Sequence, residues 1–347
     1  MTATTARAGA AAAGAPAPLA PARRTPTRTR TRTRRRVWAW GVGGAGVLLA
    51  LVMLLHDRIP NRPGNLGSLV ETFLPWTGVP AVLLLAAAAV FARRPRAALV
   101  CALLPAVVWA GSFGPALTRG GGTAAEGPGG FTVVSHNVDD ANPDPEGTAR
   151  ALAASGAQLI ALQELVQPAV RTYQAVLAAS HPYHEVRGTV GIWSTHPLRD
   201  TRAVPVMPWT RALRTTADTP GGPVTVYVAH LASVRIRPSA GFATGNRDAA
   251  AARLAAELEA GPPGRTVLVG DFNGTTGDRA MAAVFSGFRP AQREAGSGFG
   301  FSWPAAFPVA RIDHVLVRGL DPVAAWTLPA TASDHLPVAA RLRHTPG

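Results

Sequence analysis

A run of 19 apolar or glycine residues at positions 37–55 constrains this chain of 347 residues more than any other segment. At a rise of about 1.5 Å per residue, a helix of that length crosses a bilayer core of about 30 Å. Two further apolar runs follow at 72–92 and 97–117. Their prolines argue only weakly against helices, because membrane helices tolerate proline. The sequence predicts a membrane anchor over residues 37–117 with three spans, and two spans is the competing interpretation.

The segment before the first run, residues 1–36, consists mainly of Ala, Pro, Thr and Arg and has no aromatic or acidic residue. Such a composition cannot bury apolar surface, so this Arg-rich tail is predicted to be disordered. Residues 1–119 carry 15 of the 34 basic residues, all of them arginines, against two acidic residues. Two interpretations of the tail stay open: attraction to anionic lipid head groups, or a topology signal alone.

Arginines flank the predicted spans unequally, and this asymmetry predicts the orientation of the anchor. Nine arginines precede the first run and three lie between the second and third, whereas the first loop has two and the end of the third run has one. The tail and the second turn are therefore expected in the cytoplasm. With three spans, the sequence predicts a multi-pass cell-membrane protein whose remaining domain is extracytoplasmic. With two spans, that domain would be cytoplasmic.

The Gly-rich segment 118–130 is typical of a flexible linker. The region after it, 131–347, has a net charge near zero and predicts a folded domain. Short runs rich in β-branched residues predict strands at 131–134, 159–162, 190–193, 224–228, 266–269, 312–317 and 338–342. Helices are predicted at 146–154, 168–179 and 247–260. Because strands outnumber helices, an α/β or α+β sandwich is favoured over a strictly alternating parallel fold.

Polar residues gather where these predicted strands begin or end, the positions at which a rigid scaffold usually carries reactive groups. A plain core sheet would not need them, because buried carboxylates and imidazoles are unfavourable unless they are paired or bound to metal. The residues concerned are Asn137, Asp139, Glu164, His230, Asp271, Asn273, Asp313, His314, Asp334 and His335.

The residue types in this set indicate a chemistry. The single cysteine, Cys101, lies in an apolar run, and carboxylate and amide oxygens suit Mg²⁺, with Mn²⁺ as the alternative, better than zinc. A cation of that kind beside an Asp or His that activates water is typical of phosphoester hydrolysis. Without any lysine the chain has no P-loop for nucleoside triphosphates. No Gly-x-Ser-x-Gly serine-hydrolase motif follows a predicted strand, so acyl transfer is not supported.

Six short motifs occur in a fixed order over 131–343. They are Ser135-His-Asn-Val-Asp139, Leu162-Gln-Glu-Leu165, Ala229-His-Leu231, Gly270-Asp-Phe-Asn273, Arg311-Ile-Asp-His314 and Ser333-Asp-His-Leu-Pro337. Together they make this region resemble the endonuclease/exonuclease/phosphatase superfamily, which has the DNase-I-like fold. The resemblance implies a four-layer α/β sandwich, two packed mixed β-sheets flanked by helices, here preceded by about three transmembrane helices.

The same resemblance implies a metal site and a water-activating residue. Glu164 would be the principal metal ligand, with Asn137 and Asp139 completing the site or orienting the phosphate. Asp140 adjoins Asp139, and the spacing allows either of the two. Asp271 would orient or deprotonate the attacking water.

The resemblance also implies which residues hold the phosphate. Asn273 would hydrogen-bond a phosphate oxygen, and His230 and His335 would contact the scissile phosphate and assist proton transfer. Asp334 would fix the orientation of a histidine or touch the metal. Asp313 would support the histidines, although pairing with a neighbouring arginine is an alternative.

The substrate stays open between nucleic acid and lipid head groups. The predicted domain has no basic run, but Arg211, Arg214, Arg235 and Arg237 flank the strand that ends at His230 and can form a local basic stripe. Trp303 is open between substrate contact and core packing.

The membrane anchor favours an extracytoplasmic metal-dependent phosphodiesterase, nuclease or phosphatase. The alternatives are a lipid head-group phosphodiesterase and a catalytically silent, membrane-tethered binding module. Glu71 is the only ionisable residue associated with the spans and lies near one end, so they are interpreted as an anchor rather than a transport path. The oligomeric state is left open.

Overall fold

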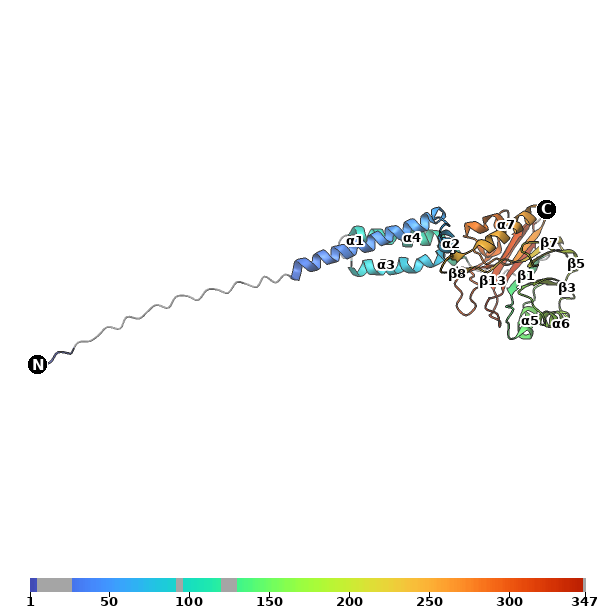
Figure 1. Ribbon diagram of the computed structural model, residues 1–347, viewed down its shortest axis with the longest axis horizontal. Helices are drawn as coiled ribbons and strands as arrows, with labels where there is room; N and C mark the ends of the chain where they lie inside the picture. The colour runs from blue at the N-terminus through green and yellow to red at the C-terminus, as the bar shows by residue number, and fades with distance from the viewer. Residues whose placement is uncertain (5–26, 92–95, 120–129, 346–347) are drawn as a thin grey trace.

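Two six-stranded mixed sheets lie face to face in the C-terminal part of the chain (Figure 1). The computed structural model describes residues 1–4, 27–91, 96–119 and 130–345. Strand order is β13-β14-β1-β2-β4-β3 in the first sheet and β11-β12-β10-β7-β6-β5 in the second. Helices cover the outer faces of both sheets, so the predicted four-layer sandwich is confirmed.

The strands of the first sheet are β1 Gly130–Asn137, β2 Leu159–Gln163, β3 Tyr183–Arg187, β4 Val190–Ser194, β13 Leu320–Thr327 and β14 Val338–His344. Those of the second are β5 Leu198–Ala203, β6 Ala212–Thr219, β7 Gly222–His230, β10 Thr266–Asp271, β11 Arg289–Pro290 and β12 Asp313–Arg318. A separate hairpin joins β8 Arg235–Arg237 to β9 Gly241–Ala243.

Alternation along the central strands explains the layers. Val133 of β1 packs between the two sheets, whereas its neighbour Val134 packs under helices on the outer face. In β7, Val226 faces the core between the sheets and Tyr227 faces the helices of the other side. Both faces of these strands are buried, which is why the sequence shows continuous apolar runs there.

The helices of this domain are α5 Pro145–Ala154, α6 Ala169–Leu177, α7 Gly245–Glu259, α8 Ala282–Phe285, α9 Ala291–Ala295 and the 3₁₀ turn η3 Arg279–Met281. The seven predicted strands and three predicted helices all exist, with shifted ends. The predictions missed β3, β5, β6, β13 and the shorter elements, because polar or partly exposed residues interrupt their apolar pattern.

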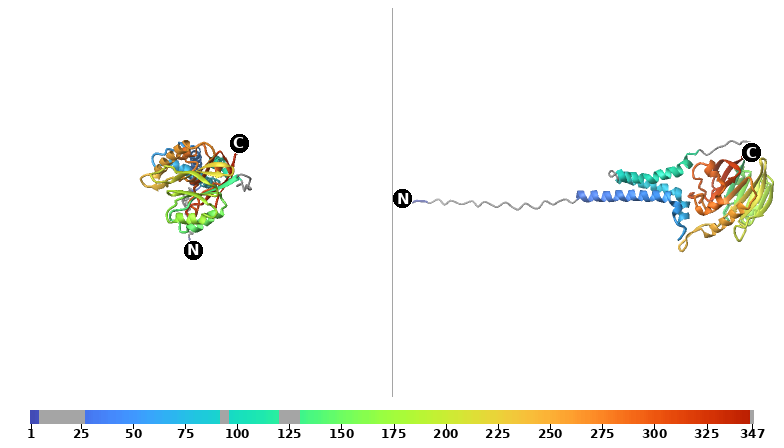
Figure 2. Two further views of the ribbon diagram at one scale, coloured as in Figure 1. Left: turned by 90° about the vertical axis from the view of Figure 1, so that its right-hand side faces the viewer. Right: turned by 90° about the horizontal axis from the view of Figure 1, so that it is seen from above.

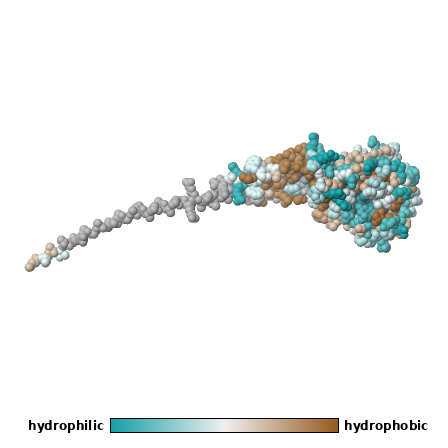
Figure 3. Space-filling model, viewed as in Figure 1, coloured by the Kyte–Doolittle hydropathy of each residue, from teal (hydrophilic) through white to brown (hydrophobic). Residues whose placement is uncertain are grey.

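Three long helices lie side by side before this domain: α1 Thr27–Leu54, α3 Gly78–Phe91 and α4 Arg96–Thr118 (Figure 1). Small residues let α1 and α4 approach closely, since a Cβ on Gly46 would lie 2.6 Å from the carbonyl oxygen of Cys101. The hydrophobic surface of these helices contrasts with the mostly hydrophilic C-terminal domain (Figure 3). The C-terminal domain lies at one end of the helices (Figure 2).

Three short elements connect α1 to α3: η1 His56–Arg58, α2 Leu66–Thr72 and η2 Leu74–Thr77. We call residues 56–77 the platform. Two helices, Arg36–Leu54 and Ala98–Thr118, are long and apolar enough to cross a membrane. The pair Leu66–Thr72 and Leu74–Val90 qualifies only as one span bent by 72°.

The structure corrects the predicted boundaries of the anchor. The second run was expected to span from Thr72, but Thr72 ends α2 and the straight helix begins only at Gly78, because Pro75 in η2 cannot continue the helix of the preceding turn. The tail was expected to be disordered to residue 36, yet α1 begins at Thr27, and arginine is a good helix former. Residues 5–26 of the tail and 120–129 of the predicted linker lie outside the described residues.

Candidate active site

Strand direction brings the predicted site residues to one edge of the two sheets. β1 and β2 run parallel, so Asn137 and Glu164 lie where they end. β7 and β10 are also parallel, and their last residues, His230 and Asp271, are register partners. The carboxyl ends of parallel neighbours therefore place the four side chains at one edge of each sheet.

Antiparallel neighbours complete the same edge from the opposite direction. β12 runs against β10, and its first residue, Asp313, is the register partner of Asp271. β14 runs against β1 and begins beside Ser135, so His335 precedes it at this edge. Residues separated by up to about 200 positions in the chain thus meet because strands start and stop there.

Asn137 links the two sheets across this edge. Its Nδ2 donates to Oε1 of Glu164 and to Oδ2 of Asp271, both at 3.0 Å, while its Oδ1 accepts the backbone N–H of Asp139 at 3.1 Å. In this structure Asn137 therefore positions two carboxylates, and its implied role of completing the metal site or orienting the phosphate stays a prediction.

Asp271, Asp313 and His335 form a buried cluster of two carboxylates and an imidazole. His335 Nδ1 lies 2.8 Å from Oδ2 of Asp313, and His335 Nε2 lies 3.9 Å from Oδ2 of Asp271. Burial and the neighbouring Asp313 raise the pKa of Asp271 to about 7, although His335 opposes that shift. Asp271 is therefore poised to exchange a proton near neutral pH.

The same contacts act in opposite directions on the other two groups. Burial alone would lower the pKa of His335, but the adjacent Asp313 and Asp271 raise it to about 10. Burial alone would raise the pKa of Asp313, yet the charge and hydrogen bond of His335 lower it. At neutral pH the pair is an imidazolium held by a carboxylate, with Nε2 free to donate toward the cavity.

His230 stands in a different electrostatic environment. It is fully buried, with Nε2 at 3.5 Å from Oε1 of Glu164 and 3.6 Å from Oδ2 of Asp271. The guanidinium of Arg211 lies against its ring. Burial, followed by the positive charge of Arg211, holds the pKa of His230 well below its usual range. The site thus contains one charged and one neutral histidine.

Asn273 is held in a left-handed conformation, with φ of 47°, by bonds at both ends. Its backbone N–H donates to Oδ1 of Asp271 at 2.8 Å and its Nδ2 donates to the carbonyl of Leu231 at 3.1 Å. The buried Arg247 donates to the carbonyl of Asn273 and pairs with Asp278 at 2.7 Å. This support fixes the loop that follows β10.

A second acidic group lies beside the buried cluster and is more accessible. Carboxylate oxygens of Asp139, Asp140 and Glu164 all lie within 4.8 Å of one another. Asp139 and Glu164 both have positive φ, 63° and 61°, conformations that point to a local functional constraint. Three close carboxylates of which two line a cavity are a suitable set of oxygen donors for a divalent cation.

The structure places Asp313 against a histidine, as expected for its supporting role, whereas Asp334 makes no hydrogen bond to a histidine among the described residues. Asp313, rather than Asp334, accepts the hydrogen bond of His335 Nδ1 and orients that ring. Asp334 is exposed, stays 3.8 Å from His335 Nε2, and accepts a 3.1 Å bond from the indole of Trp303. Asp313 does not pair with Arg311, which donates instead to the carbonyl of Gly300. Trp303 therefore lies beside the site and not in the core.

A cavity of about 350 Å³ opens over these groups. Its polar wall contains Asp139, Glu164, Asp271, Asn273, Asp334 and His335. Its other walls contain Arg235 and several residues that the sequence analysis did not connect with the site: Thr72, Phe73, Ser233, Val234, Phe242, Ala310 and Ile312. Thr72 and Phe73 come from the platform, so the segment that joins α1 to α3 forms part of the cavity wall.

The remaining predicted side chains divide between site and packing. His136 and His314 are buried and bond to Thr331 Oγ1 and to the carbonyl of Gly274, which is typical of histidines that pack in a fold. Arg211 and Arg235 of the expected basic stripe reach the site, and Arg235 lines the cavity. The sequence analysis did not identify Arg247 as a residue that supports the site, because the local sequence does not distinguish a buried arginine from an exposed one in a helix.

A family model described as the endonuclease/exonuclease/phosphatase family matches residues 134–335, more than half of the chain. The chain belongs to this family. Its members are hydrolases that act on phosphoesters and generally use divalent metal ions. A search of curated proteins found no match.

Solved structures share the fold of residues 130–345. TDP2 from D. rerio in complex with a single-strand DNA product has a TM-score of 0.52 at 17% identity, covering 62% of this chain and 99% of that one. A functionally unknown conserved protein from Enterococcus faecalis V583 has a TM-score of 0.51 at 18% identity, covering 62% and 100%. At these identities the likeness shows the fold alone.

Proposed function

We propose that this protein is a membrane-anchored phosphoester hydrolase that depends on a divalent metal ion and uses in-line attack of water. The observation that carries the proposal is the direct contact of Asn137 with both Glu164 and Asp271. This contact joins a group of metal-binding type to a carboxylate whose pKa is near neutral. A binding module would not need the two to be coupled.

The donor set fits Mg²⁺ or Mn²⁺. Glu164 with Asp139 and Asp140 offers carboxylate oxygens only, beside an open cavity, and such hard ligands suit these ions. A cation held there would stabilise negative charge on the phosphate oxygens during the reaction.

The chain's own residues would divide the remaining work. Asp271 accepts a proton from the attacking water, for which its raised pKa is well matched. The imidazolium of His335, oriented by Asp313, donates from Nε2 to a phosphate oxygen or to the leaving oxygen. His230 and Asn273 line the same edge and hold the phosphate as neutral partners. The oxygen of water bonds to phosphorus, one P–O ester bond breaks, and the leaving oxygen takes a proton.

We further propose the arrangement of the chain in a cell. Residues 37–117 form a multi-pass anchor in the cell membrane, and 131–347 form the catalytic domain. α1 and α4 run toward this domain and α3 runs away from it (Figure 1), an arrangement that supports three passes. With the arginine-rich segments in the cytoplasm, the catalytic domain is extracytoplasmic. External protease should then remove the domain from intact cells, and its full protection would contradict this placement.

The test of the hydrolase uses the purified full chain in detergent with bis-p-nitrophenyl phosphate, single-stranded DNA, RNA and phospholipid vesicles. Hydrolysis with Mg²⁺ or Mn²⁺ that stops with EDTA and falls at least about 100-fold in Asp271→Asn supports the proposal. Asp200→Asn is the matched control, because Asp200 is exposed in β5 and forms a surface ion pair with Arg199. Equal rates for both variants and the wild type would overturn it.

A further inference from the structure

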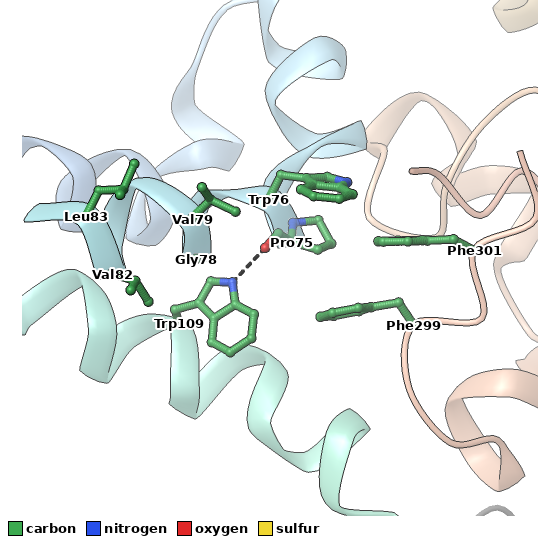
Figure 4. Close-up of a pocket in the computed structure, with 9 residues that line it drawn as sticks. All are labelled: Pro75, Trp76, Gly78, Val79, Val82, Leu83, Trp109, Phe299 and Phe301. Carbon is green, nitrogen blue, oxygen red and sulfur yellow. Dashed lines mark hydrogen bonds between the residues drawn. The ribbon is translucent and has the colours of Figure 1, made fainter. Parts of the chain in front are cut away.

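A second cavity, of about 490 Å³, lies between the membrane helices and the catalytic domain. Nine residues line it, and Figure 4 shows them around the gap between α3, α4 and a loop of the catalytic domain. We call it the apolar groove. Its lining is Pro75, Trp76, Gly78, Val79, Val82, Leu83, Trp109, Phe299 and Phe301. None of these side chains carries a charge.

The aromatic wall of the groove is built so that its polar atoms are already satisfied. Trp109 Nε1 donates to the carbonyl of Pro75 and Trp76 Nε1 donates to the carbonyl of Val309, both at 2.7 Å. Trp76 stacks on Phe301 at 6.0 Å between centroids, and Phe301 stacks on Phe299 at 5.1 Å. What remains toward the groove is carbon, so an aliphatic chain suits it and a polar ligand does not.

The opposite wall opens toward the bilayer. Val79, Val82 and Leu83 of α3 are 52%, 64% and 64% exposed within the protein, on a helix that belongs to the anchor. Trp76 and Trp109 line the groove beside the first turn of α3. A lipid beside α3 can therefore enter the groove sideways without crossing water.

The apolar groove and the active-site cavity share a boundary. Phe73 lines the cavity and Pro75 the groove, and they are two residues apart across the start of η2. Phe301 lines the groove and Trp303 the cavity, again two residues apart. A molecule with an apolar chain in the groove thus carries its polar end toward the catalytic groups.

Contacts between the platform and the catalytic domain hold the two cavities in this relation. Glu71 is 3% exposed and accepts the Nε of Arg279 at 2.9 Å and its backbone N–H at 3.0 Å. Arg279 Nη2 also donates to the carbonyl of His56 at 2.8 Å. Ser68 Oγ donates to Asp278 at 3.0 Å. The domain therefore presents its site to the membrane side.

The hairpin of β8 and β9 adds a surface of membrane-binding type. Its Ile236 is 78% exposed and stands between Arg235 and Arg237, and Arg235 lines the active-site cavity. Phe242 in the same hairpin is bonded to Gly64 and Asn65 of the platform, at 2.9 and 2.7 Å. An exposed apolar residue flanked by arginines at this level suits phosphate head groups and acyl chains.

We propose that the substrate is a membrane lipid with a phosphoester head group, and that the apolar groove holds one of its hydrocarbon chains while the phosphate reaches the catalytic site. This rests on the hydrolase proposed above and names its substrate class. Water adds to phosphorus, the ester bond on one side of the phosphate breaks, and the released alcohol oxygen takes a proton.

The test uses the full chain in vesicles of phosphatidylglycerol, phosphatidylcholine and phosphatidylethanolamine, with bis-p-nitrophenyl phosphate as a soluble substrate. Val82→Trp and Val79→Trp fill the groove from an exposed position, so neither disturbs a packed core. Leu48→Trp is the matched control, because Leu48 is 64% exposed on α1 and does not line the groove. We expect the ratio of lipid to soluble hydrolysis to fall at least tenfold in the groove variants only.

A second readout does not depend on catalysis. Phosphatidylglycerol with a diazirine on one acyl chain should label the peptides containing residues 75–83 and 299–301 in the wild type. Labelling should fall at least fivefold in Val82→Trp and stay unchanged in Leu48→Trp.

The outcomes separate the two proposals. The lipid inference is overturned if the ratio of lipid to soluble hydrolysis is unchanged in the groove variants. It is also overturned if the wild type hydrolyses DNA or the soluble ester but hydrolyses none of the lipids. Both results leave the hydrolase standing. If nothing is hydrolysed, the hydrolase fails. If the wild type is then still labelled in the groove and Val82→Trp is not, a lipid-binding groove remains supported. If the wild type is not labelled there, the lipid-binding groove is overturned as well.

Discussion

The two cavities at the junction of the N-terminal helices and the C-terminal domain differ in size, charge and lining. The active-site cavity, about 350 Å³, contains Asp139, Glu164, Asp271 and His335, whereas the apolar groove, about 490 Å³, contains no charged residue. Only η2 and a short loop before β12 separate them. Strand ends build the first, and the meeting of helices with a loop builds the second. Chemistry and substrate selection can therefore be altered separately.

The largest effect that separates the cavities is expected from Glu164→Gln. Loss of a carboxylate from the Asp139, Asp140 and Glu164 group should lower hydrolysis of every substrate at least about 100-fold and raise the Mg²⁺ concentration for half-maximal rate. Acyl-chain labelling of the groove should not change.

The matched control for that variant is Glu146→Gln, since Glu146 is exposed on α5 and pairs with Arg150. Steady-state rates over a Mg²⁺ titration provide the measurement. A Glu164→Gln enzyme with a normal rate and normal Mg²⁺ dependence would remove Glu164 from the metal site.

Next in size is the effect of uncoupling the cavities with Glu71→Gln. The variant weakens the buried ion pair with Arg279, and hydrogen bonds to charged groups contribute about 1.5–3 kcal/mol each. The free energy of unfolding of the catalytic domain should fall by about 1–3 kcal/mol. Lipid hydrolysis should fall more than hydrolysis of the soluble ester, because presentation to the membrane is lost first.

Glu294→Gln supplies the comparison for Glu71→Gln, because it removes an exposed pair with Arg289. Denaturant unfolding followed by tryptophan fluorescence measures stability, and the two rates measure coupling. Equal losses for both substrates would show that the platform does not direct the site to the lipid. That result would correct our view of Glu71, which the sequence alone assigns to a passive anchor.

The free energy of unfolding should depend on pH through His335, which lines the active-site cavity. The pKa of His335 is raised from 6.5 to about 10, so its pairing with Asp313 stabilises the fold fully below pH 6.5 and loses this contribution as pH rises toward 10. Between these limits the stability advantage of the wild type over His335→Gln should shrink by at most about 1.4 kcal/mol per pH unit.

Denaturant unfolding in EDTA at pH 7, 8, 9 and 10 tests this pH effect. His196→Gln is the control. Burial lowers the pKa of His196, so this imidazole has no charge to lose between pH 7 and 10. A stability difference that stays constant from pH 7 to 10 would contradict the charged state of His335.

The smallest effect is expected where the cavities meet, from Trp303→Phe. The change removes the 3.1 Å bond to the exposed Asp334, and a hydrogen bond of this kind contributes about 1 kcal/mol. KM should rise by roughly fivefold or less while kcat changes little. Trp326→Phe, on β13, is a suitable control. A large loss of kcat instead would mean that Trp303 positions Asp334 for catalysis.

Most of the catalytic fold was accessible from the sequence. Apolar runs marked β1, β2, β4, β7, β10, β12 and β14 because these strands are buried on both faces. Strands such as β3 and β5 escaped because they are half exposed, with polar residues at most positions. An apolar pattern cannot identify a strand that is held in place mainly by hydrogen bonds to the neighbouring strands.

The candidate site was recoverable as a set of residues but not as a set of contacts. Short motifs supplied Glu164, His230, Asp271 and His335, since each lies at a strand end or within three residues of one. Which of Asp313 and Asp334 orients His335 depends on which carboxylate reaches His335 Nδ1. Spacing along the chain cannot distinguish them, because both lie near the same strand ends.

The sequence by itself determined the apolar helices, the succession of seven strands along the chain and the types of polar residue at their ends, since each depends on composition and local pattern. Tertiary structure alone decided that Thr72 and Phe73 wall the active-site cavity and that Arg279 meets Glu71, 208 positions away. It also decided the apolar groove, because α3, α4 and the loop at 299–301 meet only when the domain docks on the platform. Contacts between distant segments follow from packing, which no local pattern encodes.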